Sequence, residues 1–410
     1  MRRVGLIAVP LAAAATALAG VAPAAAQTAA SSAPSIGAPA AIVIDASNGE
    51  VLFGRRERDH RAIASTTKLM TAQIALTRTR PQEVFAMPPY PISPAESLIG
   101  LRTGERMTVH DLLRAMMLPS ANDAAYDLAV NIGGSKAAFV RMMNAQARRL
   151  HLTGTHYSTP VGLDDPRNYS TAYDLAKLAA YDLRNKTFAR IVNLPSARLR
   201  SGSHPRTVLN RNTLVREYPF VDGVKTGHTA RAGYVLVGAA KQHGAQVISV
   251  VLGTPSESAR DDDSIALLRW GVRQFRRSLA VVSHRTYARA DVKWHDGAKV
   301  HLVASRSFAF TARRGERVTR RVQAPNELSG PLKAGTRVGA VQVVYRGKVV
   351  QTVPLVTASP IQGASFIQKA TNSFGGPLPT VALIAFLGAA ATLALRIRST
   401  RVMRRERAAR

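Results

Sequence analysis

The sequence feature that most constrains this chain is an uncharged stretch of eighteen residues near its C-terminus, Leu378–Leu395. As a helix rising about 1.5 Å per residue, it would span roughly 27 Å, close to the hydrocarbon thickness of about 30 Å. Seven arginines and one glutamate follow within residues 396–410. Arginines beside a span stay on the cytoplasmic side. We therefore expect a single membrane-spanning helix over 378–395, a basic cytoplasmic tail over 396–410 and a main body outside the cytoplasm.

The N-terminus has the layout of a secretory signal. Arg2 and Arg3 precede the uncharged residues 4–21, and three consecutive alanines end at Ala26. This order of basic flank, apolar run and small-residue site predicts a signal peptide over 1–26, cleaved after its last alanine. An uncleaved anchor helix is the alternative, and the two prolines and the alanine-rich character of this region favour cleavage.

The composition fits a folded protein whose surroundings are anionic, such as nucleic acid, acidic lipid or an anionic cell envelope. The chain has 410 residues, 46% of them hydrophobic, enough for one large domain and a smaller one. It contains no cysteine, which excludes disulfide frameworks, thiolate zinc sites and cysteine nucleophiles. The net charge of +31 indicates anionic surroundings. Because the basic tail adjoins an apolar span, we expect a membrane and no nucleic acid as its partner.

Residues 38–280 read as one domain with strands at both ends and helices between them. Apolar runs at 41–44 and 51–53 flank Asn48-Gly49, a strong hairpin signal, and strand patterns return at 234–237 and 247–252. We predict one antiparallel sheet, built from both ends of this segment, with a helical block packed on it. This is an α+β (mixed α/β) domain.

Helix signals fill the middle of that domain. Thr108 with Asp111 and Thr171 with Asp174 are capping patterns ahead of apolar helical spacing. A further helix is predicted around Ile265–Phe275.

From residue 281 the pattern changes to short strands, at 299–304, 307–311 and 318–322. A hairpin of 341–345 and 349–353 turns at Arg346-Gly347. We expect a small β-rich domain over 281–357, followed by a linker over 361–376.

The first segment that can carry chemistry is Ser65–Lys68, at the start of a predicted helix. Side chains three residues apart share one face of a helix, so the Ser65 hydroxyl and the Lys68 amine can meet. Free backbone N–H groups at a helix N-terminus stabilise a developing anion. Lys68 can accept the serine proton only as a neutral amine, which requires burial or a nearby cation to lower its pKa. Alone, the segment is more typical of an ordinary capped surface helix.

Two further segments offer groups that can act on a bound peptide. Ser120 and Asn122 follow a predicted helix stop and provide a hydroxyl for proton relay and a carboxamide that can hold a peptide backbone. Lys225–Gly227, ahead of the strand at 234, provides a cation, a hydroxyl and a glycine that permits close approach. Placed near Lys68, that cation would also lower its pKa. Each segment alone is weak evidence.

Together and in this order, the three segments resemble the serine–lysine site of penicillin-binding proteins and related β-lactamases. Longer segments resemble the D-alanyl-D-alanine carboxypeptidases, the low-molecular-mass penicillin-binding proteins of the penicillin-binding protein 5 type. These segments are Phe139–Asn144, Gly162–Asp164, Tyr169–Ala176 and Asp222–Thr229. The resemblance covers about 38–280 and implies a β-lactamase/transpeptidase-like fold. Residues 281–357 resemble, more loosely, the C-terminal β-domain of that family.

The resemblance implies a role for each matching residue. Ser65 would be the acylated nucleophile, Lys68 its general base and Ser120 a proton relay. The terminal carboxylate of the substrate would lie against Lys225 and Thr226, and the backbone N–H groups of the nucleophile and of residue 228 would form an oxyanion hole. The implied substrate-binding residues are Asn122, Lys225, Thr226, Gly227, His228 and Arg260.

The chain departs from the family pattern in two places. Val161 stands where relatives often carry histidine, which bears on substrate preference and leaves the chemistry unchanged. Relatives often end in an amphipathic helix that lies on the membrane, whereas this chain has a candidate full span.

The implied activity is removal of the terminal D-alanine from a peptidoglycan pentapeptide through a Ser65 acyl-enzyme, with β-lactam antibiotics acylating the same serine. No metal and no cofactor is expected: the ten histidines form no His-Glu-x-x-His pattern, and the acidic residues 261–263 suit a helix start. The catalytic domain is expected outside the cytoplasm, held at the cell membrane.

Three alternatives share these residues. A class A β-lactamase would need a glutamate to activate water, and the sequence offers no convincing counterpart. An endopeptidase or transpeptidase would use the same acyl-enzyme with another acceptor. A wall-binding scaffold with a vestigial site is the third, and the intact Ser65, Lys68 and Lys225 disfavour it.

Overall fold

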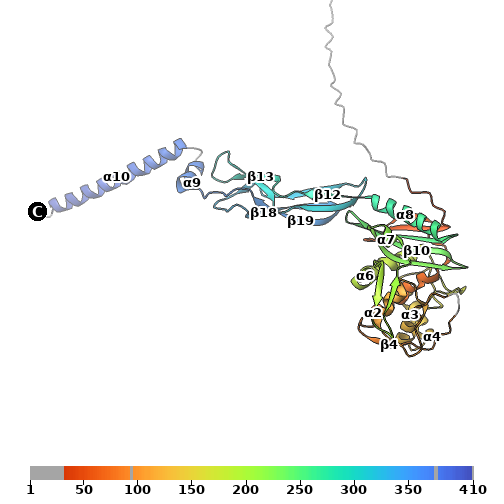
Figure 1. Cartoon of the computed structure of the whole chain (residues 1–410). Helices are drawn as coiled ribbons and strands as arrows, with labels where there is room; N and C mark the ends of the chain where they lie inside the picture. Colours follow the sequence, from red (N-terminus) through yellow and green to blue (C-terminus); the bar gives the residue numbers. More distant parts are fainter. Residues whose placement is uncertain (1–31, 93–95, 374–376, 409–410) are drawn as a thin grey trace, which may run out of the picture.

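The computed structural model describes residues 32–92, 96–373 and 377–408, and the predicted signal peptide over 1–26 lies outside this part of the chain. Figure 1 shows three parts that follow one another: a first domain of helices and sheet, an elongated β-module and the long helix α10. The first domain runs from β1 to α8, and the β-module from β12 to β19.

Five antiparallel strands form the central sheet of the first domain, and they come from both ends of its sequence. Strand β1 forms the predicted hairpin with β2 and pairs on its other side with β11, and β9 is the edge strand beside β10. The predicted sheet is therefore confirmed. In sheet order its strands are β2 (Val51–Arg55), β1 (Ala40–Asp45), β11 (Ala245–Thr254), β10 (Gly233–Gln242) and β9 (Val221–Thr229).

Helices cover both faces of this sheet. In β1, Ile42 and Ile44 join the core under the helical block, whereas Ala41 and Val43 join the core under α8. Successive strand residues point to opposite faces, which explains why all six residues of β1 are buried. The helical block consists of α1 (Lys68–Arg78), α2 (Val109–Met117), α3 (Asn122–Gly133), α4 (Lys136–Arg149), α5 (Ala172–Asp182) and α6 (Lys186–Val192).

Two helix starts follow the predicted capping patterns. The hydroxyl of Thr108 accepts the backbone N–H of Asp111 at the start of α2, and that of Thr171 accepts the N–H of Asp174 at the start of α5. The helix predicted at 265–275 is α8 (Glu257–Arg273), which starts eight residues earlier. Its first two turns are almost entirely polar, so apolar spacing could not locate its start.

The first domain also contains two short helical segments and three two-stranded ribbons. Helix α7 (Leu214–Glu217) packs on β9, and η1 (Ala64–Thr67) is a 3₁₀ turn that precedes α1. The two-stranded ribbons pair β3 (Arg61–Ala62) with β6 (Tyr169–Ser170), β4 (Val84–Ala86) with β5 (Arg106–Thr108) and β7 (Ser196–Leu199) with β8 (Arg206–Leu209).

The β-module contains a six-stranded sheet in the order β16-β18-β19-β14-β13-β17 and the ribbon β12-β15. The strands predicted from the sequence are present, but β12 and β13, which precede them, were not predicted. The elements are β12 (Phe275–Val281), β13 (Thr286–Val292), β14 (Lys299–Ala304), β15 (Phe308–Arg313), β16 (Val318–Gln323), β17 (Glu327–Leu328), β18 (Arg337–Tyr345) and β19 (Lys348–Thr357).

One acidic side chain of the first domain connects it to the β-module. The carboxylate of Glu50 pairs with the guanidinium groups of Arg313 and Arg346, the latter at 2.6 Å. The hydroxyl of Thr311 also donates to the backbone carbonyl of His243 at 2.8 Å. Side-chain contacts therefore connect the β-module to the first domain, in addition to the covalent backbone.

Two helices follow the β-module. Helix α9 (Phe366–Ser373) lies within the expected linker, and α10 (Pro377–Ala408) includes the predicted span and continues into the basic tail. Within α10, Val381–Arg401 is long and apolar enough to cross a membrane, and none of its side chains is buried. Figure 1 shows α10 at the end of the molecule opposite the first domain.

Candidate active site

Ser65 and Lys68 meet at the start of α1, although the helix begins later than predicted. Ser65 lies in the 3₁₀ turn η1, and the α-helix starts at Lys68. The Nζ of Lys68 lies 2.9 Å from the Oγ of the half-buried serine. A single 3₁₀ turn therefore achieves the juxtaposition that helical spacing predicted.

Lys68 is fully buried, and three oxygen atoms surround its amine. Besides Ser65, Nζ contacts the Oδ1 of Asn122 and the backbone carbonyl of Val161, each at 2.6 Å. A neutral amine has two hydrogens and one lone pair. The carboxamide and the carbonyl can only accept, so they take the two hydrogens and the lone pair is left for the serine O–H. This is the geometry that a general base requires.

The electrostatics of the site favour the neutral amine. The pKa of Lys68 is lowered to about 7, chiefly by burial and also by the guanidinium of Arg211. The carboxylates of Glu96 and Asp123 act in the opposite direction. Arg211, which lies in a loop that shows no motif, is a cation that the sequence did not predict to act on Lys68.

Asn122 is held in one orientation from both sides. Its Nδ2 donates to Glu96 at 2.8 Å, and its Oδ1 faces Lys68. Glu96 also accepts a hydrogen bond from the hydroxyl of Tyr90. Asn122 follows the predicted helix stop and is itself the first residue of the next helix, α3. Sequence reasoning missed Glu96, because an isolated glutamate in a proline-rich loop carries no signal.

Ser120 lies in the turn between α2 and α3. Its φ is +69°, a left-handed backbone conformation that costs energy for any residue except glycine. Its hydroxyl is buried and has no hydrogen-bond partner within the described part of the chain. A strained backbone that holds an unpartnered hydroxyl fits a group kept ready for a ligand or for proton relay.

Lys225 and Thr226 lie inside the edge strand β9, whereas the sequence pattern predicted a strand only from residue 234. Both side chains are buried, and the Nζ of Lys225 donates to the backbone carbonyl of Thr226 at 2.9 Å. Burial holds the pKa of Lys225 well below its usual value, and the positive charges of Lys68, Arg211 and Arg260 lower it further. The two lysines are therefore electrostatically coupled, as the prediction that they converge requires.

Gly227 allows β9 to lie directly against the nucleophile. A Cβ added at this position would lie 2.9 Å from the backbone nitrogen of Ser65 and 2.9 Å from the Cγ2 of Val235. Those distances are closer than side-chain atoms tolerate, so any larger residue would separate strand and turn. The packing brings the Ser65 backbone N–H beside the strand that carries Lys225.

The last two predicted residues lie at the border of the site. The exposed ring of His228 stacks on Tyr234, with 4.0 Å between ring centroids. Arg260 is buried near the start of α8, and its guanidinium pairs with Glu257 and Asp261 at 2.8 Å each. Arg260 acts on the site through its charge, which lowers the pKa of Lys225.

The acidic residues 261–263 lie in α8, and two of them make structural contacts. Asp261 pairs with Arg260, and the carboxylate of Asp263 accepts the backbone N–H groups of Gly37 and Ala38. Among the residues that the structure describes, no group of three or more His, Asp and Glu side chains could hold a metal ion. The chemistry available is that of a serine hydroxyl, a neutral amine and a second buried lysine, which suits acyl transfer.

Two family profiles match the chain. The profile described as D-alanyl-D-alanine carboxypeptidase matches residues 27–256, and the one described as penicillin-binding protein 5, C-terminal domain, matches residues 281–362. The first covers the sheet, the helical block and the residues around Ser65, and the second covers almost all of the β-module.

Curated relatives match most of the chain. The D-alanyl-D-alanine carboxypeptidase DacD of Escherichia coli is 30% identical over 356 residues, which cover 83% of this chain and 91% of that protein. The carboxypeptidase DacF of Bacillus subtilis is 28% identical over 347 residues, with 82% and 89% covered.

Solved structures show the same architecture. Penicillin-binding protein 6B from Escherichia coli is 30% identical with a TM-score of 0.59, covering 80% of this chain and 98% of that one. Penicillin-binding protein 5 from Haemophilus influenzae is 28% identical with a TM-score of 0.57, covering 81% and 99%. The Streptomyces K15 DD-transpeptidase is 32% identical with a TM-score of 0.56, covering 59% of this chain and 99% of that one.

Proposed function

Because the chain belongs to the D-alanyl-D-alanine carboxypeptidase family of serine peptidases, we propose that it removes the terminal D-alanine of peptidoglycan stem peptides through an acyl-enzyme on Ser65. The observation that carries the proposal is the surroundings of Lys68. Its buried amine has acceptors at Asn122 and Val161 for two hydrogens, and Ser65 lies at the third contact. A base in this state can take the serine proton at neutral pH.

Acylation begins with transfer of the Ser65 hydroxyl proton to Lys68. The serine oxygen bonds to the carbonyl carbon of the penultimate D-alanine, and the carbonyl oxygen becomes an oxyanion. The backbone N–H groups of Ser65 and His228 stabilise it, and each such donor contributes about 3 to 4 kcal/mol in comparable sites. The carbon–nitrogen bond then breaks, and the departing D-alanine takes a proton from Lys68 through Ser120.

Deacylation uses water as the acceptor. Water gives a proton to the same base and attacks the ester carbon, and the serine oxygen leaves and regains its proton. Substrate is held by Lys225 and Thr226 at its terminal carboxylate and by Asn122 at its backbone. A β-lactam, whose ring amide takes the place of the D-alanyl-D-alanine amide, would acylate Ser65 in the same way.

The C-terminal helix α10 would hold the catalytic domain at the cell membrane. We propose that α10 crosses the cell membrane once, with its arginine-rich end in the cytoplasm and the catalytic domain outside. The β-module then separates the active site from the bilayer, since it lies between the first domain and α10 (Figure 1).

The test is D-alanine release from a synthetic pentapeptide by the full chain in detergent. We expect release by the natural chain and none by Ser65→Ala, which should keep its fold because changes near a helix start cost about 1 kcal/mol. Release that persists in Ser65→Ala would refute the assignment.

The structural likeness to a DD-transpeptidase gives the second candidate, in which an amine replaces water as acceptor. Adding a D-amino acid to the same reaction separates the two, because an exchanged peptide would form in place of the shortened one. Fluorescent penicillin adds a second readout: stable labelling supports the carboxypeptidase, rapid turnover a β-lactamase, and no labelling a vestigial site.

A further inference from the structure

One loop of the first domain connects the turn that carries Ser65 with the end of strand β9. The loop spans residues 159–168, between α4 and β6. It contains Asp164, a carboxylate to which the sequence pattern assigned no role of its own. The contacts at the base and at the tip of this loop show what that carboxylate does.

The base of the loop is bound to the nucleophile turn by buried hydrogen bonds. The hydroxyl of Thr71, in the second turn of α1, donates to the backbone carbonyl of Pro160 at 2.7 Å. The amide of Asn168 donates to the hydroxyl of Thr67 at 3.0 Å, and Thr67 belongs to the same 3₁₀ turn as Ser65. The base of the loop is therefore fixed relative to the nucleophile.

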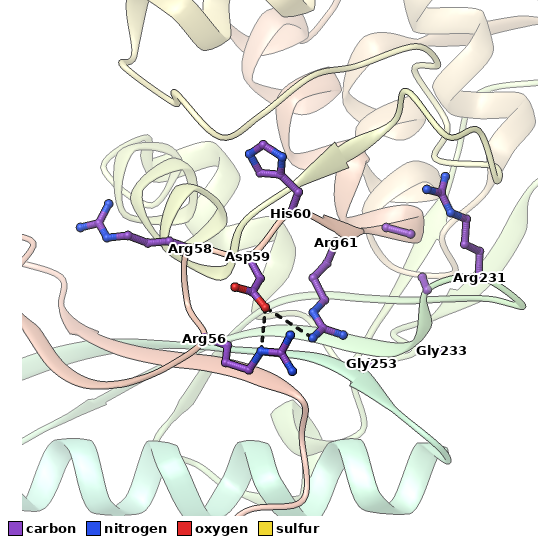
Figure 2. Close-up of a pocket in the computed structure, with 10 residues that line it drawn as sticks. Arg56, Arg58, Asp59, His60, Arg61, Arg231, Gly233 and Gly253 are labelled. Atoms are coloured by element: carbon purple, nitrogen blue, oxygen red, sulfur yellow. Dashed lines mark hydrogen bonds and ion pairs between the residues drawn. The ribbon is translucent and has the colours of Figure 1, made fainter.

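The tip of the loop is bound to the turn that follows β9. One carboxylate oxygen of Asp164 accepts the hydroxyl of Thr229, the last residue of β9, at 2.6 Å, and the other accepts the backbone N–H of Arg231 at 3.1 Å. The side chain of Arg231 points away from Asp59 at one end of a basic pocket (Figure 2), so it is the backbone of this residue that meets the carboxylate. The Thr229 hydroxyl also accepts the backbone N–H of Ala232 at 3.1 Å, which fixes its orientation. Asp164 therefore holds the turn at two points.

The end of β9 needs such a contact. On the proposed function, the backbone N–H of His228 stabilises the oxyanion, and this residue directly precedes Thr229. Within the described part of the chain β9 pairs only with β10, and its last two residues are exposed or half-buried, so few surrounding atoms restrain them. A carboxylate forms hydrogen bonds roughly twice as strong as those of a neutral acceptor, which suits it to fix this end.

We propose that Asp164 is a positioning residue for acylation: it fixes the end of β9 and thereby keeps the His228 backbone N–H at its place opposite Ser65. The inference rests on the proposed function and adds a residue to it. The loop can do this because its base is fixed to the turn of the nucleophile and its tip to the strand of the oxyanion donor. Such a donor acts only within hydrogen-bond distance of the forming oxyanion, so a displacement of about 1 Å can cost about a hundredfold in rate.

The test measures acylation of the full chain in detergent by fluorescent penicillin at several concentrations, which separates the affinity before acylation from the rate constant of acylation. Asp164→Ala removes both acceptor oxygens and should lower the rate constant by about ten- to a hundredfold, with the affinity unchanged. Asp164→Asn should recover most of the rate, because its oxygen can accept the Arg231 N–H and its amide can donate to the Thr229 hydroxyl. A role in folding alone would not produce this separation of rate from affinity.

A second substitution examines the same contact from the strand. Thr229→Val keeps the shape of the side chain and removes its hydroxyl, so it should also lower the rate constant. The variant that combines Thr229→Val with Asp164→Ala should be no slower than Asp164→Ala alone, because the hydrogen bond between the two side chains is then already absent.

The matched control is Asp165→Ala, which removes the neighbouring carboxylate of the same loop. That carboxylate accepts the backbone N–H of Arg167 at 2.8 Å, inside the loop, so the rate constant should stay unchanged. Circular dichroism checks the folding of each variant.

Three results would overturn the inference while the natural chain is labelled: an unchanged rate constant in Asp164→Ala, a loss that Asp164→Asn does not recover, or losses that add in the double variant. If the natural chain itself is not labelled, the proposed function is refuted and this inference with it.

Discussion

Lys68 is the residue whose protonation decides whether the site can react. Its pKa is lowered by burial to about 7, and only the neutral amine can accept the Ser65 proton. We predict that the acylation rate by penicillin rises about tenfold from pH 6 to pH 8 and then levels off. Lys68→Arg should be inactive at every pH, because a guanidinium stays charged. A rate that is flat between pH 5 and 8 would contradict this role.

Glu96 is predicted to set the position of that pH dependence. Its carboxylate holds the amide of Asn122 and raises the pKa of Lys68. Glu96→Gln removes the negative charge and keeps a hydrogen-bond acceptor. The pKa of Lys68 should then fall, so the rise of the acylation rate with pH should move to lower pH.

The control for this change is Glu83→Gln, an exposed carboxylate outside the site, which should leave the profile in place. If the acylation rate of Glu96→Gln rises at the same pH as that of the natural chain, or at a higher pH, this carboxylate does not act on Lys68.

Among the residues of the site, the sequence predicted only those that belong to short motifs. Ser65, Lys68 and Asn122 were predicted, and the structure brings them into contact. Glu96 and Arg211, which act on Lys68 from loops, could not be predicted because their effect depends on folding alone. The contact from Val161 is also invisible in the sequence: it uses the backbone carbonyl, so the identity of the side chain does not report it.

Strand β9 is the element whose position matters most for the site, and Gly227 fixes it. We predict that Gly227→Ala slows acylation by about a hundredfold, the loss seen when one oxyanion donor is misplaced. The added Cβ would clash with the Ser65 backbone nitrogen and push the strand away. The measurement is the labelling rate with fluorescent penicillin, with circular dichroism as a check of folding.

Gly37→Ala is the matched control, because a Cβ there would meet its nearest neighbour at an ordinary 3.8 Å. Equal labelling rates for the two variants would mean that β9 tolerates the displacement and that its contact with Ser65 is not needed.

Elements whose own residues carry a turn or capping pattern were predicted from the sequence. The strands β9 and β12, which carry no such pattern, were missed. The hairpin of β1 and β2 has an Asn-Gly turn, and the starts of α2 and α5 have capping threonines. The strand β9 was missed because its two glycines, Gly223 and Gly227, break the strand pattern that its pairing with β10 restores. The strand β12 was missed because arginines interrupt its apolar residues.

At the scale of the whole molecule, Glu50 of the first domain forms ion pairs with Arg313 and Arg346 of the β-module. Pairing with Arg346 lowers the pKa of Glu50, so the link is present at neutral pH and is lost when the carboxylate is protonated in acid. We predict that Glu50→Gln increases cleavage between α8 and β12 in limited proteolysis of the full chain, without changing D-alanine release from a soluble peptide.

Glu327→Gln, which alters only a distant and exposed pair with Lys293, should cleave like the natural chain. Unchanged cleavage in Glu50→Gln would show that the covalent connection alone holds the two parts together.

The measurement that tests the central claim most directly is identification of the penicillin-acylated residue in the full chain. Trypsin should release the peptide Ala62–Lys68, and mass spectrometry should find the penicilloyl group on Ser65 within it. The adduct should be absent from Ser65→Ala. A penicilloyl group on any other residue, or one that forms equally in Ser65→Ala, would contradict the assignment of Ser65 as the nucleophile.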